Sequence, residues 1–254
     1  MPLNFKKTVL LLCSMFVAMV VWAKNPVYHY VQIHTEKGDA LLRLYNKTPK
    51  HRDNFVKLVR EGYYEHLLFH RVIENFMIQG GDPDSRYAAQ KQALGEGGPD
   101  YTLPAEIQEG LIHKKGAIGA ARDNNPAKKS SGSQFYLVQG RVFSEAALDS
   151  LEQFWLPNGK LSPAQREAYS TVGGAPHLDG NYTVFGELIK GLDMIDQVAK
   201  VATDERDRPL EDVHLSMQVL TRREALNLER ELAGLPPKIG FLTKVLDIFH
   251  ARAY

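Results

Sequence analysis

The clearest pattern in the chain is the alternation of apolar and polar residues over positions 27–35. A polar turn at 36–39 separates it from a second apolar run at 40–45, and this arrangement predicts a β-hairpin. Loops that carry Gly and Pro separate further short apolar runs, which are typical of strands in an antiparallel sheet. We expect these later strands at residues 66–73, 77–79, 117–121, 135–138, 184–188 and 213–220.

Two helices are expected among these strands. Thr48 followed by Pro49 is typical of a helix start and Gly62 of a helix stop, so the first helix should cover Pro49–Arg60 with Thr48 as its cap. Apolar residues on one face of 191–200 predict the second. Many short strands with only two internal helices favour a mainly β protein built on an antiparallel barrel.

Two further segments have helical spacing. Residues 144–176 carry an apolar stripe, and Ser162 followed by Gln165 resembles a capped helix start. This segment is either a helical hairpin beside the functional face or an elongated surface loop, and both interpretations stay open. Residues 221–254 are charged at first and amphipathic after two consecutive prolines. That pattern favours a helical tail, packed on the protein or pairing in a dimer, over one lying on a membrane surface.

Residues 1–23 resemble a secretory signal peptide, since two lysines precede a short apolar run that ends near Ala23. The run is shorter than the roughly 20 residues that span a bilayer, so an uncleaved anchor is the weaker alternative. Cys13 is the only cysteine, and Leu12 before it argues against a lipoprotein. Cleavage near Ala23 would leave a mature protein without disulfides or thiolate chemistry. We expect it in the periplasm or otherwise exported.

Composition narrows the choice of partners. The 254 residues include 44% hydrophobic ones, enough for a sizeable core. The 31 basic residues nearly balance the 30 acidic ones, so the protein has no net field that would attract nucleic acid. We therefore expect no nucleic-acid partner.

The candidate chemistry is concentrated in residues 69–82, FHRVIENFMIQGGD. This segment combines one guanidinium, Arg71, one neutral amide, Gln79, and several large apolar side chains. Such a mixture suits an apolar pocket with a few fixed polar groups, and it does not suit acid/base or metal chemistry. We expect neither a metal nor a cofactor.

Together with SGSQFY at 131–136, HLDG at 177–180 and VFGE at 184–187, this segment resembles the cyclophilin-type peptidyl-prolyl isomerases. The resemblance covers residues 27–220, with 144–176 as an insertion. It implies a closed eight-stranded antiparallel barrel capped by two helices, to which the helical insertion and the helical tail at 221–254 are added.

The resemblance also implies roles for individual residues. Arg71 would be the catalytic group and Gln79 would hydrogen-bond the substrate backbone. For Arg71 the structural alternative is an ion pair with Glu74 or Asp82, and for the apolar residues it is core packing. The implied proline pocket is lined by Phe76, Met77, Tyr136 and Leu178, the substrate edge by the main chain of Ala121 and Arg122, and the site is completed by Gln134, His177 and Tyr182.

Some residues depart from the family pattern. Arg122 and Tyr182 stand where many eukaryotic members carry Asn and His, which resembles the bacterial branch. His177 stands where sensitive members carry the Trp that contacts cyclosporin, so weak cyclosporin binding is expected. Neither His70 nor His177 is needed as a base, and Phe135, which alternates with Tyr136 along its strand, is expected in the core.

The function implied is isomerisation of X–Pro bonds during the folding of exported proteins, a step slow enough to limit folding. Its partners would be unfolded or folding polypeptides that contain proline. The alternative is a peptide-binding chaperone module with little turnover. The insertion and the tail could also serve as docking surfaces for one client or for the cell envelope.

Overall fold

A computed structural model of the chain describes residues 25–154, 156 and 159–237. Two compact units are present, one formed by residues 28–219 and the other by the segments that precede and follow it. The expected signal peptide at 1–23 and the amphipathic end of the tail lie outside the described residues.

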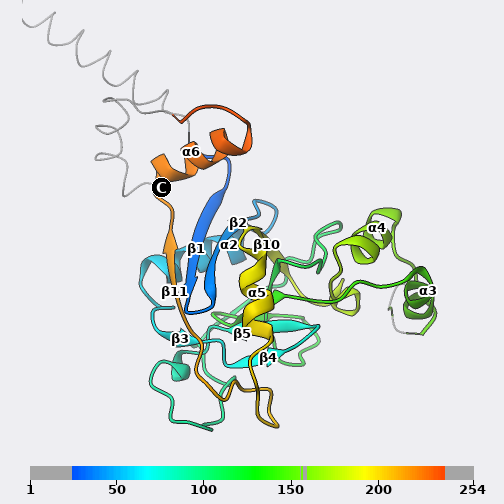
Figure 1. The fold of residues 1–254 in the computed structure, drawn as a ribbon, viewed down its shortest axis with the longest axis horizontal. Coiled ribbons are helices and arrows are strands. Elements are labelled where there is room, and N and C mark those ends of the chain that lie inside the picture. The colour runs from blue at the N-terminus through cyan, green and yellow to red at the C-terminus, as the bar shows by residue number, and fades with distance from the viewer. Residues whose placement is uncertain (1–24, 155, 157–158, 238–254) are drawn as a thin grey trace, which may run out of the picture. The chain divides into compact units, whose positions relative to one another are not determined.

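The larger unit is built on a nine-stranded antiparallel sheet (Figure 1). The predicted hairpin is confirmed as β1 (His29–Thr35) and β2 (Gly38–Leu44), which pair along their whole length. A separate two-stranded sheet joins β6 (Thr102–Leu103) to β8 (Ser130–Ser131). The strand order is β3 (Leu67–Leu68), β11 (His214–Val219), β1, β2, β10 (Val184–Lys190), β7 (Ala117–Ala120), β9 (Phe135–Val138), β5 (Met77–Gly80) and β4 (Arg71–Ile73).

The prediction of a closed eight-stranded barrel is wrong, because this sheet curls into a half-barrel and stays open between its edge strands β3 and β4. The expected single strand at 66–73 is also wrong. β3 pairs with β11 at one edge and β4 pairs with β5 at the other, with only Phe69 and His70 between them. The chain therefore passes directly from one edge to the other. Because no turn separates β3 from β4, the two strands cannot lie side by side. No ladder of hydrogen bonds therefore joins them, and the sheet stays open between them.

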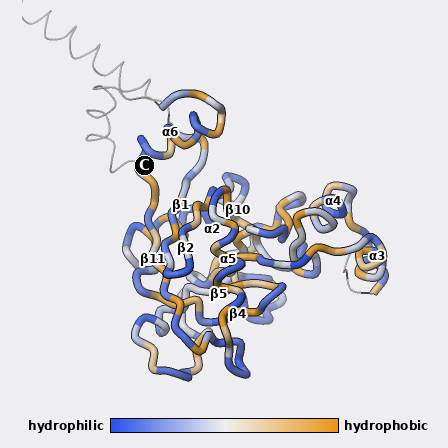
Figure 2. Tube along the Cα trace, in the orientation of Figure 1, coloured by the Kyte–Doolittle hydropathy of each residue, from blue (hydrophilic) through white to orange (hydrophobic). Residues whose placement is uncertain are grey.

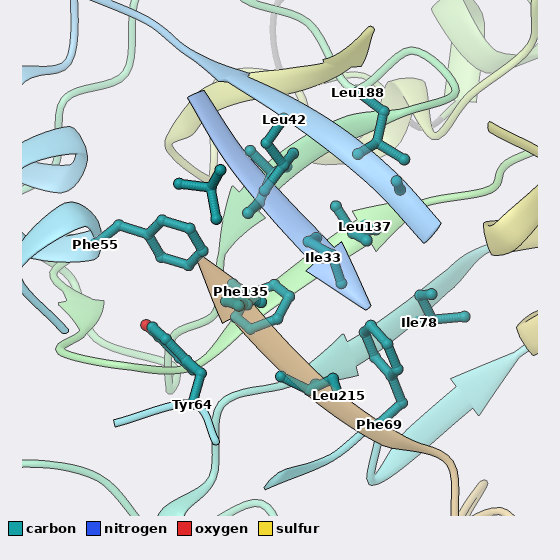
Figure 3. Close-up of a cluster of buried hydrophobic side chains, with 14 of the residues drawn as sticks. Ile33, Leu42, Phe55, Tyr64, Phe69, Ile78, Phe135, Leu137, Leu188 and Leu215 are labelled. Atoms are coloured by element: carbon teal, nitrogen blue, oxygen red, sulfur yellow. The ribbon is translucent and has the colours of Figure 1, made fainter. Parts of the chain in front are cut away.

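The main core lies inside the curl of the sheet, around Phe135 (Figure 3). Its ring makes edge contacts with Phe55, Tyr64 and Phe69, at centroid distances of 5.7, 5.7 and 6.3 Å. Edge-to-face packing of this kind is favourable between aromatic rings. The core position expected for Phe135 is confirmed.

Helix α2 (Pro49–Arg60) has the predicted bounds and buries Phe55 in the core, but its start differs from the prediction. The Thr48 hydroxyl donates to the Tyr45 carbonyl and does not cap the helix. The Glu106 carboxylate instead accepts the main-chain N–H groups of Lys50 and His51. A carboxylate satisfies free N–H groups at a helix start as a cap residue would. The second predicted helix is α5 (Leu192–Ala199).

The insertion forms two helices, α3 (Glu145–Phe154) and α4 (Pro163–Thr171), which lie next to each other (Figure 1). Ser162 and Gln165 make the capping box that the sequence predicts at the start of α4. Arg166 of α4 forms ion pairs with three carboxylates of α3. Polar and apolar residues are interspersed along the hairpin (Figure 2). A small core of its own holds the hairpin together, formed by Phe143, Leu148, Leu161 and Tyr169.

The smaller unit contains α6 (Arg222–Leu232), which begins with a capping box between Thr221 and Glu224. The Arg222 side chain donates to Asn25, so the two segments of this unit are joined. Among the helices of the described residues, none combines the length and the apolar character that a membrane crossing requires.

Candidate functional site

A cavity of about 380 Å³ opens in the larger unit, beside strands β4, β5 and β9. It brings together nine of the residues predicted for the site. Two others, Gln134 and His177, do not line it but contact residues that do. The nine lining residues are Arg71, Phe76, Met77, Gln79, Ala121, Arg122, Tyr136, Leu178 and Tyr182.

The register of four neighbouring strands places the central residues in one row. Arg71 of β4 lies opposite Gln79 of β5, Gln79 lies opposite Tyr136 of β9, and Tyr136 lies opposite Gly119 of β7. Side chains that are directly opposite in antiparallel strands point to the same face of the sheet. The guanidinium, the amide and the aromatic ring therefore reach the same cavity from separate strands.

The Arg71 guanidinium is held from one side. Its Nε donates to the Asp207 carboxylate at 3.2 Å, so the partners considered from the sequence, Glu74 and Asp82, are wrong. Asp82 is buried and accepts main-chain N–H groups of Asp84 and Gly95 instead. Among the described residues, no hydrogen bond engages the terminal nitrogens of Arg71. These donors remain available to a bound molecule.

Gln79 is oriented by Gln134. The Gln134 amide nitrogen donates to the carbonyls of Gly95 and Gly97, at 2.8 and 2.7 Å. Its oxygen must then face Gln79, whose Nε2 donates to it at 2.9 Å. The Gln79 oxygen is left without a partner in the part of the chain that the structure describes. Gln134 thus shapes the site indirectly, through Gln79.

The remaining walls are largely apolar. Met77, Tyr136 and Leu178 belong to one buried cluster. The His177 ring packs on Phe76 with centroids 5.2 Å apart. Phe76, Ala121 and Tyr182 are half-buried against the same cluster.

The sequence predicts a substrate edge formed by the main chain of Ala121 and Arg122, but in the described chain only one of these two residues has free main-chain groups. The Ala121 N–H donates to Gln134 and its carbonyl accepts from Ser131, so both groups already serve the fold. The N–H and C=O of Arg122 have no hydrogen-bond partner within the described ranges. The Arg122 guanidinium lies over the Tyr182 ring, 4.6 Å from its centroid. Of the two residues, only Arg122 therefore has main-chain groups that the described chain leaves open to a further partner.

Sequence reasoning missed a group of residues in and around the cavity. Asp207, which holds Arg71, comes from a loop more than 130 positions away in the chain. The buried Arg208 donates to the carbonyls of Ala89 and Gln92, and it fixes the loop that forms another wall. No local pattern reveals either residue. His113 and Asp179 lie behind Tyr136, and only Asp179 carried a signal, its place in the HLDG motif at 177–180.

The comparisons with known proteins agree with this geometry. The family model described as "Cyclophilin type peptidyl-prolyl cis-trans isomerase/CLD" matches residues 30–219. The chain belongs to this family. One relative comes from Staphylococcus aureus strain USA300 and has a name that places it among the peptidyl-prolyl cis-trans isomerases. It is 36% identical to this cyclophilin over 184 residues. The match covers 72% of this chain and 87% of the relative.

A similarly named relative from Staphylococcus saprophyticus is 35% identical over 182 residues, covering 71% of this chain and 86% of its own. Among solved structures, a Cryptosporidium parvum cyclophilin superposes with a TM-score of 0.55 at 23% identity. It covers 76% of this chain and 98% of its own length. A second structure of that protein, obtained in the presence of the dipeptide Ala-Pro, gives a TM-score of 0.53. At this identity the likeness supports the fold alone.

Stability should depend on pH through His70, which lines the cavity with both ring nitrogens unpartnered in the described chain. Burial lowers its pKa from 6.5 to about 4. Between these values the unfolded chain binds the proton and the folded chain does not. The free energy of unfolding should therefore fall by about 2 kcal/mol from this group between pH 7 and pH 5.

Urea unfolding of the wild type and of His70→Asn at pH 5, 6, 7 and 8 measures this contribution. The variant should lose less stability than the wild type on acidification. Parallel pH profiles for the two proteins would contradict the assignment.

Gly119→Ala should damage the pocket. A Cβ at Gly119 would lie 2.3 Å from the Tyr136 ring, far inside contact distance, so the ring must leave its position in the cavity wall. We expect about a tenfold loss of kcat/KM for an X–Pro peptide, with about 1–3 kcal/mol of destabilisation from overpacking. Gly98→Ala is the matched control, because its Cβ would meet only ordinary contacts at 3.7 Å. Equal activity of the two variants would show that the Tyr136 ring does not shape the site.

Proposed function

We propose that this cyclophilin isomerises X–Pro bonds of exported polypeptides as they fold, with Arg71 as the catalytic group and Gln79 as the anchor for the substrate backbone. The observation that carries the proposal is the row of Arg71, Gln79 and Tyr136 along one cavity. A charged donor, a neutral amide and an apolar wall are what this reaction requires.

Rotation about an X–Pro bond must overcome amide resonance, a barrier of about 18–20 kcal/mol. No bond is broken, so the protein needs neither a nucleophile nor a proton acceptor. A donor that interacts more strongly with the prolyl nitrogen as it becomes pyramidal lowers the barrier. Arg71 is always charged, and its Nε contact with Asp207 aims the guanidinium while its terminal nitrogens remain open to the substrate.

The rest of the site holds the substrate while the bond turns. The cluster of Met77, Tyr136 and Leu178, with Phe76 at its edge, offers an apolar surface for the proline ring. The Gln79 amide, oriented by Gln134, and the main chain of Arg122 offer hydrogen bonds to the peptide backbone. Fixing one part of the substrate lets the other part rotate.

The exported setting is supported by the first 23 residues, where two lysines, a short apolar run and Ala23 follow the pattern of a signal peptide. The clients would be proline-containing chains that fold after export. Slow X–Pro isomerisation, which takes tens to hundreds of seconds without a catalyst, gives such an enzyme its use.

The decisive measurement is the cis–trans exchange rate of a short X–Pro peptide, determined with wild type, Arg71→Ala and Arg71→Lys. Arg71→Ala should lower kcat/KM about 100-fold, the scale of losing one transition-state donor, and Arg71→Lys should recover part of it. The exposed Arg60→Ala, at the end of α2, is the control and should retain wild-type rates.

Equal rates for wild type and Arg71→Ala would overturn the assignment of Arg71 as the catalytic group. The same assay with cyclosporin should show little inhibition, because His177 stands where sensitive members carry a tryptophan.

Export is tested by expressing the full chain, fractionating the cells and determining the mature N-terminus by mass spectrometry. The protein should be recovered outside the cytoplasm with Lys24 as its first residue. Ala23→Arg should block the cut and leave the longer form, while the isomerase activity of the folded domain is retained. A wild-type protein that keeps Met1 in the cytoplasmic fraction would overturn the proposal.

A further inference from the structure

We infer that the inserted helix α4 positions the wall of the proline pocket through a chain of buried and half-buried hydrogen bonds that ends at Tyr136. This inference rests on the proposed function, because it assigns positioning roles to residues behind the same site. The residues involved are Gln165, Tyr169, Asp179 and His113.

The chain of contacts is continuous. Tyr136 Oη lies 2.8 Å from His113 Nε2, and His113 Nδ1 lies 2.8 Å from Asp179 Oδ1. The other carboxylate oxygen, Asp179 Oδ2, accepts from Tyr169 Oη at 2.6 Å and from Gln165 Nε2 at 2.9 Å. Two side chains of α4 are thereby connected to the pocket through two intermediates.

The surroundings of these groups determine which atoms donate and which accept. His113 and Tyr169 are fully buried, and Tyr136 is 5% exposed. Burial by itself would raise the pKa of Asp179, but hydrogen bonds from His113 and Tyr169 outweigh it and lower the pKa, so the carboxylate is ionised. An ionised carboxylate can only accept, so His113 Nδ1 donates to it, and in the neutral imidazole Nε2 then accepts a hydrogen bond from the Tyr136 hydroxyl.

The consequence is a fixed orientation of the Tyr136 ring. Its hydroxyl is bound to His113 behind the pocket, and Gly119 leaves the room that the ring needs. The ring face is therefore left to contact a proline. If the hydroxyl lost its acceptor, it would seek another partner in a buried apolar wall, and the ring would have to move with it.

The inserted hairpin is thus more than an elongated surface loop. Asp179 accepts four hydrogen bonds, two from His113 and two from α4, so removing the helix would free half of its acceptor sites. Tyr169 also belongs to the hairpin's own core, and its carbonyl accepts the main-chain N–H of Phe143. The position of its hydroxyl is consequently determined by the packing of both inserted helices.

A double-mutant cycle between Tyr169→Phe and Tyr136→Phe tests the inference. Tyr169→Phe removes one hydroxyl without changing the packing volume of the hairpin core. It should lower kcat/KM about fivefold in the wild-type background, mainly through KM, because the pocket wall is less well positioned. In the Tyr136→Phe background the same change should alter kcat/KM less than twofold, since no hydroxyl remains to be held.

Two more variants separate positioning from general destabilisation. Gln165→Leu removes the second α4 contact to Asp179 and the Gln165 half of the capping box, so it should lower both stability and kcat/KM, with the loss of kcat/KM showing the same dependence on Tyr136. Arg166→Gln is the matched control in the same helix, because it breaks the ion pairs with α3 and touches neither Asp179 nor His113. It should lower the melting temperature while leaving kcat/KM within twofold of wild type.

A spectroscopic measurement gives a readout independent of turnover. The side-chain ¹⁵N spectrum of wild-type His113 should show a protonated Nδ1 and an unprotonated Nε2, and Asp179→Asn should abolish this single tautomer. Equal losses from Tyr169→Phe in both Tyr136 backgrounds, or no loss in the wild type, would overturn the inference. An inactive wild type would overturn the proposed function instead, while the His113 spectrum would still decide the hydrogen-bond chain.

Discussion

The antiparallel register of β4, β5, β9 and β7 is the constraint on which the site depends. It aligns Arg71, Gln79, Tyr136 and Gly119 across four strands, so that a donor, an amide, a ring and the space for that ring share one face. A slip of one residue in any of these ladders would turn a whole set of side chains to the other face. The core protects the register, because Phe135, next to Tyr136, is buried on the opposite face among three aromatic rings. The geometry of the candidate site and the core packing are therefore two consequences of the same pairing.

Buried polar groups extend this order from the strands to the loops around the cavity. A buried carboxylate or guanidinium is costly unless it is fully hydrogen-bonded, and each of those near the site is bonded to main chain. Asp82 holds the loop that carries Gly95, Arg208 holds the loop around Gln92, and Gln134 bonds to the first of these loops and orients Gln79. The pocket thus has rigid walls even where it has no regular secondary structure. This rigidity suits a reaction in which the protein's main task is to hold one half of the substrate still.

Features that depend on local pattern can be predicted from the sequence. The bounds of helix Pro49–Arg60 follow from its start and stop signals, and nine of the eleven residues expected at the site line the cavity. What failed depends on contacts between distant segments: the helix start is satisfied by Glu106 and not by Thr48, and Arg71 pairs with Asp207. The closed barrel failed for a related reason, because pairing of one segment with two different edges is not encoded in its own periodicity. Hydrophobic alternation shows that a strand exists, and only the fold shows where its partner lies.

The insertion shows how local and distant constraints combine. A helix of nine residues such as α4 is too short to be stable alone, even with its capping box, so its stability must come from tertiary contacts. Those contacts are the small core around Tyr169 and the hydrogen bonds to Asp179. Because Asp179 is also the group that orients His113, the hydrogen bonds that Tyr169 and Gln165 donate to it stabilise the inserted helix and order the back of the pocket at the same time. Folding of the hairpin and order at Tyr136 are therefore coupled, and the coupling must act in both directions, since a free energy shared between two sites is reciprocal.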